Sequence, residues 1–315
     1  MVLELVSRGL AKDNRRHAKA IEEIVERESV ALYTNFKVAH IAKIKSNRGI
    51  WASGGNNPFV GSLFSAVDLS QNALQRSLET SAGKTFEVIA REVGKLSYEV
   101  RDTVPIVSLT DEQQRSIAKM IAMLDSGFAI AGDPEALSEL KDSRPPGDYR
   151  KIFERLMLSD PKDIVDGEFT DEENVHHLVQ IKASGKLNKV GARAEKLELL
   201  TAAVGYQNHL KEQDVGYLQK HPMDIHLCTA LDGDIRAVSS AVRQYWRPEE
   251  LLLGADFWRF VTQLDNGGSL VMRVVRRVAQ EVGRDTMEEI ISEAYPPTLS
   301  VSDEDDEVDG DGLDL

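Results

Sequence analysis

The sequence predicts an α/β protein whose sheet lies in the second half of the chain. Apolar residues recur at helical spacing over residues 12–45, 69–100 and 110–127. The period then changes to two, and residues 163–169 and 175–183 alternate as two strands joined by an acidic turn at 170–174. A cluster of strands between two blocks of helices is typical of the α/β class.

The helices before the strands each carry a local signal. Ile21 and Val25 belong to the apolar face of the first helix, and Leu74 and Val93 to that of the second. Thr110 is a suitable N-cap for the third helix. Two short helical pieces are also expected, over 135–140 and 149–158.

The second strand is expected to present two different faces. Side chains alternate along a strand, so one face carries Val175, His177, Val179 and Ile181, and the other carries His176, Leu178, Gln180 and Lys182. Residues 223–231 predict a third strand. Further helices are predicted over 189–212, 235–246, 249–263 and 269–294.

Composition excludes several classes of protein. Hydrophobic residues make up 42% of the 315 residues, which is enough for a sizeable core. No apolar run approaches the roughly 20 residues of a membrane span, and an acidic residue at position 4 argues against a signal peptide. The single cysteine, Cys228, excludes a disulfide framework and a multi-cysteine zinc site. We therefore expect a cytoplasmic protein without a membrane partner.

The formal net charge of −14 would by itself argue against a nucleic-acid partner. However, residues 303–315 hold eight acids and no base, and without them the charge is −6. We expect this tail to stay solvated and disordered, either as a solubility device or as an intramolecular mimic of nucleic acid. The segments 29–67, 174–194 and 235–248 hold no acid at all. If the fold brings these segments together, they form a positive surface that can neutralise phosphates.

The acid-free segments and the helix after the second strand supply the residues expected to contact DNA. They are Lys43, Lys45, Arg48, Trp51, Lys186, Lys189, Arg193, Lys196, Arg243 and Arg247. Trp51 lies in a basic loop rich in Gly, Asn and Ser, which is equally consistent with an ordinary surface loop.

One group of polar residues suggests phosphodiester chemistry. Gln180 and Lys182 share a strand face, and the hairpin can bring Asp166 beside them. Mg²⁺ prefers a few hard oxygen ligands together with water and phosphate oxygens. A lysine beside such an ion can orient the attacking water and offset charge on the phosphate. Adjacent His176 and His177 face opposite sides of the strand, and His221 and His226 are poorly spaced, so histidine metal chemistry is not expected.

A resemblance to a known family supports this hypothesis. Residues 178–188, reading LVQIKASGKLN, and 192–200, reading ARAEKLELL, resemble the active-site strand and following helix of the PD-(D/E)XK nucleases. More narrowly, they resemble the TdeIII-type branch of type II restriction endonucleases. The segments 57–59, 74–80, 83–90 and 251–258 are similar to that branch in the same chain order. The resemblance covers about residues 35–262.

The resemblance implies a restriction-endonuclease-like core, in which helices flank a short mixed sheet. It implies a Mg²⁺-dependent type II site-specific deoxyribonuclease, a homodimer that cleaves double-stranded DNA at a palindromic site, with a cognate DNA methyltransferase encoded nearby. Asp166, Gln180 and Glu87 would hold Mg²⁺, and Lys182 would position the water. The family has Asp or Glu where this chain has Gln180. This departure leaves open an enzyme with weak metal affinity or an inactive copy.

The expected organisation has three parts. They are a helical region with a basic loop over 1–68, a nuclease core with helical insertions over 69–298, and the acidic tail over 299–315. Two alternatives stay open. The first is a non-specific nuclease of the same superfamily acting in repair or phage defence, and the second is a non-catalytic helical interaction protein.

Overall fold

The computed structural model describes most of the helices and strands and part of the loops. The described residues are 2–46, 66–126, 153, 165–184, 187–213, 222–231 and 239–294, without the side chains of 2–13, 43–46, 66–73, 213 and 294. The acidic tail and the loop holding Arg48 and Trp51 lie outside these residues. So do the expected helical pieces at 135–140 and 149–158, apart from Phe153, which is helical and buried.

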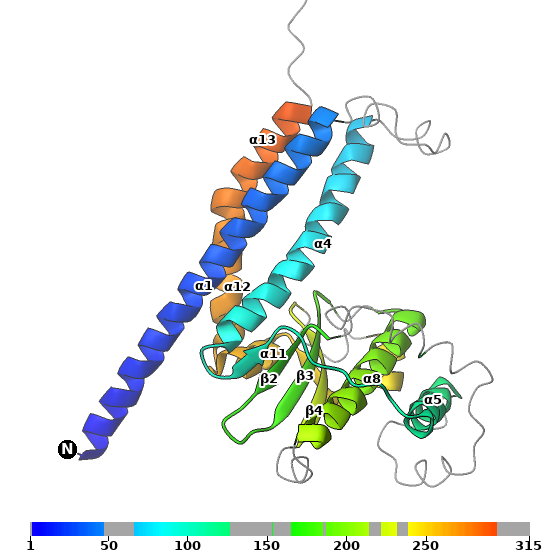
Figure 1. Ribbon diagram of the computed structural model, residues 1–315. Coiled ribbons are helices and arrows are strands. Elements are labelled where there is room, and N and C mark those ends of the chain that lie inside the picture. Colours follow the sequence, from blue (N-terminus) through cyan, green and yellow to red (C-terminus); the bar gives the residue numbers. More distant parts are fainter. Residues whose placement is uncertain are drawn as a thin grey trace, which may run out of the picture.

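The chain is an α/β protein, as predicted, and its helices lie on both faces of one sheet (Figure 1). The helices before the second strand are α1 (Val2–Ser46), α4 (Ala66–Gly94) and α5 (Asp111–Ser126). Those after it are α8 (Lys189–Gln213), α10 (Ser240–Tyr245), α11 (Ala255–Thr262), α12 (Gly267–Val278) and α13 (Arg284–Ala294). A π-helical turn, Ala279–Gly283, joins α12 to α13, so the helix predicted over 269–294 is confirmed in its extent.

The sheet is mixed and has five strands. They are β1 (Glu99–Arg101), β2 (Gly167–Thr170), β3 (His176–Lys182), β4 (Met223–Thr229) and β5 (Leu251–Leu253), in that spatial order. The pairs β1–β2 and β2–β3 are antiparallel, whereas β3–β4 and β4–β5 are parallel. Helix α8 is the crossover between β3 and β4, because parallel neighbours require a long connection. The three strands predicted from the sequence are confirmed.

Two predictions about individual elements were wrong. The segment 249–263 was expected to be one helix, but Pro248–Glu250 forms a 3-10 turn, Leu251–Leu253 pairs with β4, and the helix begins at Ala255. The segment 69–100 ends as a helix at Gly94, and β1 follows it. The cause is the same in both places. A three-residue strand has no detectable period and is held by its neighbour in the sheet rather than by its own sequence.

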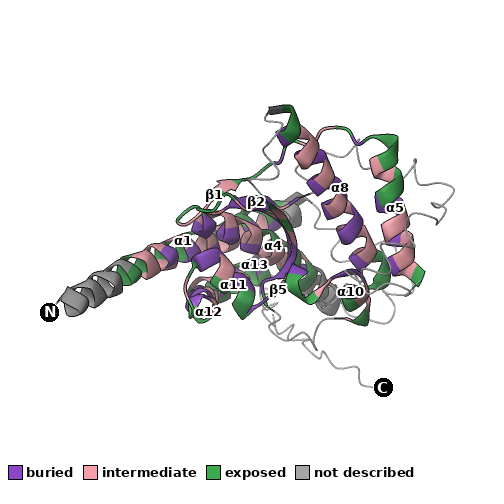
Figure 2. Cartoon of the chain, turned by 90° about the horizontal axis from the view of Figure 1, so that it is seen from below, coloured by how far each residue is buried: buried purple, intermediate pink, exposed green. Residues whose placement is uncertain are grey.

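The two faces of the sheet have separate hydrophobic cores. Helices α5, α8 and α10 cover one face, where Leu178, Leu199, Tyr206 and Trp246 are buried. Helices α1, α4, α11 and α12 cover the other face, where Val179, Ile181, Phe257 and Trp258 are buried. Figure 2 shows the buried residues gathered between these helices and the sheet. Leu178 and Val179 thus face opposite cores, which confirms the alternation predicted for this strand.

The N-cap predicted for the third helix is confirmed. Thr110 caps α5 through a reciprocal pair with Gln113: the Gln113 N–H donates to Thr110 Oγ1 at 3.3 Å, and the Thr110 N–H donates to Gln113 Oε1 at 2.9 Å.

None of the described helices is both long and apolar enough to cross a membrane.

Candidate active site

The β2–β3 hairpin brings Asp166 beside the carboxyl end of β3, as the sequence predicted. Asp166 directly precedes β2, and its N–H donates to the carbonyl oxygen of Val179 at 3.1 Å. Its carboxylate accepts a hydrogen bond from the backbone N–H of Ile181 at 2.6 Å. Lys182 is the last residue of β3. One carboxylate and one ammonium therefore meet at this end of the sheet.

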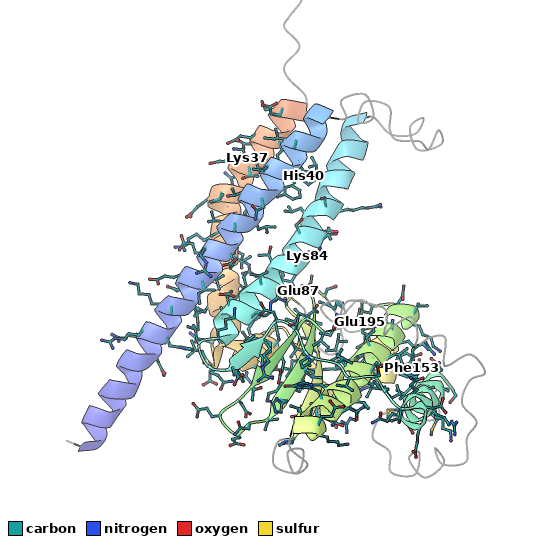
Figure 3. All side chains as sticks on the ribbon, viewed as in Figure 1. Lys37, His40, Lys84, Glu87, Phe153 and Glu195 are labelled. Carbon is teal, nitrogen blue, oxygen red and sulfur yellow. The ribbon has the colours of Figure 1, made fainter. Side chains whose placement is uncertain are left out.

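Helix α4 brings Glu87 to the same place. Arg91, one turn further along this helix, donates from Nη1 to the main-chain oxygen of Asp166 at 2.9 Å and so fastens α4 to the start of β2. The charges of Asp166 and Lys182 both act on the pKa of Glu87, which shows their proximity. In Figure 3, Glu87 and Glu195 lie at the same end of the sheet, although they come from different helices.

Glu195, on α8, completes this group and was not predicted as a site residue. Its Oε1 lies 2.9 Å from Nζ of Lys182, and the two side chains are only 15% and 28% exposed. Its other oxygen, Oε2, is buried and has no hydrogen-bond partner among the described residues. Glu198 follows one turn later. A signal for Glu195 was present, because it is the first acid after the acid-free segment 174–194 and stands in the helix that directly follows the strand of Lys182.

Gln180 stands on the strand face of Lys182 but is deeply buried. Its side chain is 4% exposed, and its Oε1 has no hydrogen-bond partner in the described part of the chain. A buried amide oxygen without a donor is costly by roughly 1–3 kcal/mol, so this position is suited to accept a ligand that the protein alone does not supply. Glu195 places a carboxylate at the same end of β3.

Four carboxyl groups, those of Asp166, Glu87, Glu195 and Glu198, lie around the ammonium of Lys182 and determine the electrostatics of the group. Burial lowers the pKa of Lys182, but the carboxylates of Glu195, Asp166 and Glu87 more than offset this and raise its pKa above the ordinary value. Lys182 therefore stays cationic. Burial, and to a lesser extent Asp166, raises the pKa of Glu87 to about 7. Burial and the neighbouring Glu195 likewise raise the pKa of Glu198 to about 7. Burial also raises the pKa of Asp166, against the hydrogen bond from Ile181 and the charge of Lys182.

These shifts predict how stability depends on pH. A glutamate whose pKa is raised on folding binds more protons in the folded state than in the unfolded one, so its contribution to the free energy of unfolding falls as pH rises from about 4.5 to about 7. We expect Glu87→Gln to flatten this fall, because it removes one titrating group. Urea unfolding of the metal-free protein at intervals across this pH range measures it. Glu212→Gln, an exposed position at the end of α8, is the matched control. If the free energy of unfolding depends on pH in the same way in Glu87→Gln and in the wild type, the raised pKa of Glu87 is contradicted.

The carboxylates around Lys182 can supply some, but not all, of the oxygen ligands of a hard divalent cation. Mg²⁺ uses one or two protein carboxylates and keeps water or phosphate oxygens as its other ligands. Asp166, Glu87 and Glu195 offer such oxygens, and the unpartnered Oε2 of Glu195 is available to it. Among the described residues, the only three ligand groups with all ligand atoms within 4.8 Å of one another are His177, Asp224 and His226, at the other end of β3. The carboxylates around Lys182 do not meet this spacing.

The residues expected to contact DNA differ in their exposure and in their ion pairs. Lys189 is exposed and donates to a main-chain oxygen of Asp125 at 3.3 Å, and Arg193 pairs with the Asp125 carboxylate at 2.9 Å. Arg243 is exposed on α10, and Arg247 is 40% exposed beside Glu249 and Glu250. The side chains of Lys43 and Lys45 and the residues Arg48, Trp51 and Lys186 lie outside what the structure describes.

The placement of Lys196 does not agree with a DNA contact. Its side chain is 3% exposed, pairs with Glu250 at 2.7 Å, and lies over the Trp246 ring at 4.6 Å from the centroid. Burial of this kind leaves no surface for a phosphate. Lys196 instead ties α8 to the segment before β5. The sequence suggested otherwise because a lysine on a helix is usually exposed unless a buried acid pairs with it.

Comparison with known proteins identifies no family for this chain. No known protein family and no curated protein matches the sequence.

Proposed function

We propose that the protein is a Mg²⁺-dependent nuclease that hydrolyses phosphodiester bonds of double-stranded DNA. More specifically, we propose a type II restriction endonuclease with a restriction-endonuclease-like core, which acts as a homodimer on a palindromic site. The observation that carries the proposal is the meeting of Asp166, Lys182, Glu195 and Glu87 at one end of a mixed sheet. The resemblance of residues 178–188 and 192–200 to PD-(D/E)XK nucleases supports it.

The side chains of this group have complementary roles in such a hydrolysis. Bound Mg²⁺ would supply Lewis-acid activation of the phosphate and of the attacking water. Lys182, held cationic by its acidic neighbours, cannot accept a proton; it donates hydrogen bonds and offsets negative charge on the phosphate. Glu87 and Glu198 have a pKa of about 7 in the metal-free protein, so a carboxylate of this pair would accept the proton of the water that attacks phosphorus, and solvent water would supply the proton that the departing 3′ oxygen takes up.

The position of Glu195 is relevant to Gln180, which stands where PD-(D/E)XK nucleases have Asp or Glu. If no other carboxylate lay near Lys182, an inactive copy would be the better interpretation. Here a carboxylate contacts Lys182 at 2.9 Å from the following helix, so the charge of the group is retained. This favours an active enzyme in which Asp166 and Glu195 supply the charged ligands and Gln180 an uncharged one.

A basic groove beside the same end of the sheet offers a path for the DNA backbone. It has a volume of about 650 Å³ and is lined by Leu231, Gly254, Arg273, Arg276 and Arg277, among others. It lies at the same end of the sheet as Lys182, because the N–H of Ala230, which also lines the groove, donates to the main-chain oxygen of Lys182 at 2.9 Å. Arg273 and Arg277 pair with Glu22 and Glu26 of α1, whereas Arg276 has no ion pair with a described residue. Exposed guanidinium groups of this kind neutralise phosphates.

Incubation of the purified full-length protein with phage DNA and Mg²⁺ tests the proposal. Discrete fragments are the expected result, because a sequence-specific enzyme cuts at fixed positions. A smear would instead support the non-specific nuclease. Absence of cleavage with Mg²⁺, Mn²⁺ and other divalent ions, together with no retention of DNA at low salt, would contradict the proposal and favour the helical interaction protein.

A further inference from the structure

Two histidines that lie far apart in the sequence meet on the sheet, at the end away from Lys182. In the parallel β3–β4 pair, His177 stands opposite Asp224, and Val179 stands opposite His226. Because paired residues of a sheet share a face, and so do residues two apart in one strand, His177, Asp224 and His226 all project from one face. Nδ1 of His177 lies 3.2 Å from Nε2 of His226 and 3.7 Å from Oδ2 of Asp224.

This group is separate from the candidate active site. His177 is near the start of β3 and Lys182 is its last residue, which puts them roughly 16 Å apart along the strand. They also lie on opposite faces of the sheet, since odd-numbered positions of β3 face the core of α4 and α11 and even-numbered ones face that of α8. On its own face the group packs beside Phe260, whose ring centroid is 5.2 Å from that of His177 and 5.9 Å from that of His226.

His177 and His226 face each other through ring nitrogens. Nε2 of His177 lies 3.4 Å from Oδ2 of Asp171, in the β2–β3 turn, and a proton held there leaves Nδ1 with a lone pair. His226 is 9% exposed, and its Nδ1 is buried without a partner among the described residues, while its Nε2 lies 3.2 Å from Nδ1 of His177. One proton makes this contact a hydrogen bond, and a metal ion that binds both nitrogens takes the place of that proton.

The geometry points to a binding site for a divalent transition metal, with Zn²⁺ as the probe, ligated by His177 Nδ1, His226 Nε2 and the Asp224 carboxylate. Tetrahedral zinc with bonds of about 2.0–2.1 Å holds its ligand atoms roughly 3.3 Å apart, close to the 3.2 and 3.7 Å found here. Asp171 occupies the position of the outer carboxylate that orients a ligating histidine. Asp224 is 57% exposed, which gives an ion access from solvent and leaves the fourth position to water.

Such an ion has a defined structural consequence. It links the start of β3 to the start of β4, and through Asp171 it reaches the turn between β2 and β3. Metal binding should therefore raise the thermal stability of the sheet, because an ion that binds only the folded state shifts the folding equilibrium.

Calorimetric titration of the metal-free, untagged protein with Zn²⁺ tests the site, in the presence of excess Mg²⁺. We expect one Zn²⁺ per chain and a rise in melting temperature. Asp224→Asn and His177→Gln should each weaken binding at least about tenfold, the usual scale for a lost ligand or its support. Asp265→Asn, a fully exposed aspartate, and Asp166→Asn, at the other end of the sheet, should leave Zn²⁺ binding unchanged.

The outcomes that would overturn the site are specific. They are an absence of Zn²⁺ binding to the wild type, undiminished binding in both Asp224→Asn and His177→Gln, or loss of binding in Asp166→Asn. Because Asp224 is exposed, Asp224→Asn should fold even if a histidine variant does not. Co²⁺ gives a second measurement: the wild type should show the visible absorption of a four-coordinate nitrogen and oxygen site, and Asp224→Asn should lose it.

Discussion

Substitution of Lys182 by methionine is expected to lower Mg²⁺-dependent DNA cleavage by about 10²- to 10⁴-fold. Methionine keeps much of the aliphatic stem and removes the ammonium that Glu195 contacts at 2.9 Å. The phosphate then loses a hydrogen-bond donor and a positive charge where negative charge develops. The loss should appear in the single-turnover rate at saturating DNA and Mg²⁺, since Lys182 acts on the reacting group.

A matched control separates this effect from a general loss of basic charge. Lys211, exposed near the end of α8, can be changed to methionine in the same way. Lys211→Met should keep near-normal cleavage, and both variants should melt as single cooperative transitions. A folded Lys182→Met variant that cleaves at the wild-type rate would remove Lys182 from the mechanism and with it the main support for a nuclease.

The second large effect is expected at Glu195. Glu195→Gln should lower cleavage by about 10³-fold, because it removes the carboxylate that pairs with Lys182 and the buried Oε2 offered to the metal. The fall should be steepest at low Mg²⁺ if Glu195 contributes to metal binding. Cleavage rates across a Mg²⁺ titration measure this, with Glu212→Gln on the exposed end of α8 as the control.

Gln180 provides the complementary test. Gln180→Glu is expected to keep or raise cleavage at low Mg²⁺, because it places a carboxylate at a position whose amide oxygen has no partner among the described residues. In the double variant Gln180→Glu with Glu195→Gln, part of the lost activity should return. If Gln180→Glu folds normally and is inactive, Gln180 is not a ligand. If Glu195→Gln is fully active, Glu195 only positions α8.

The sequence by itself determined the hairpin and the residues at its end. Alternation along residues 175–182 fixed which side chains share a face, and the acidic turn at 170–174 fixed the pairing of the two strands, so that Asp166 and Lys182 were correctly expected to meet. The cap at Thr110 was likewise decided locally, by a hydroxyl and an amide three residues apart. These features depend on neighbours in the chain, and period and spacing describe such neighbours well.

Only the tertiary structure decided which distant residues lie beside Asp166 and Lys182. Glu195 reaches Lys182 because the crossover helix α8 passes over the end of β3, and the burial of Lys196 depends on Glu250, 54 residues away. The histidines are the clearest case. Spacing along the chain excluded only the pairs His176 with His177 and His221 with His226 as metal ligands, whereas the parallel register of β3 and β4 places Nδ1 of His177 3.2 Å from Nε2 of His226. Register between strands is set by the packing of whole layers, and no local pattern in either strand contains it.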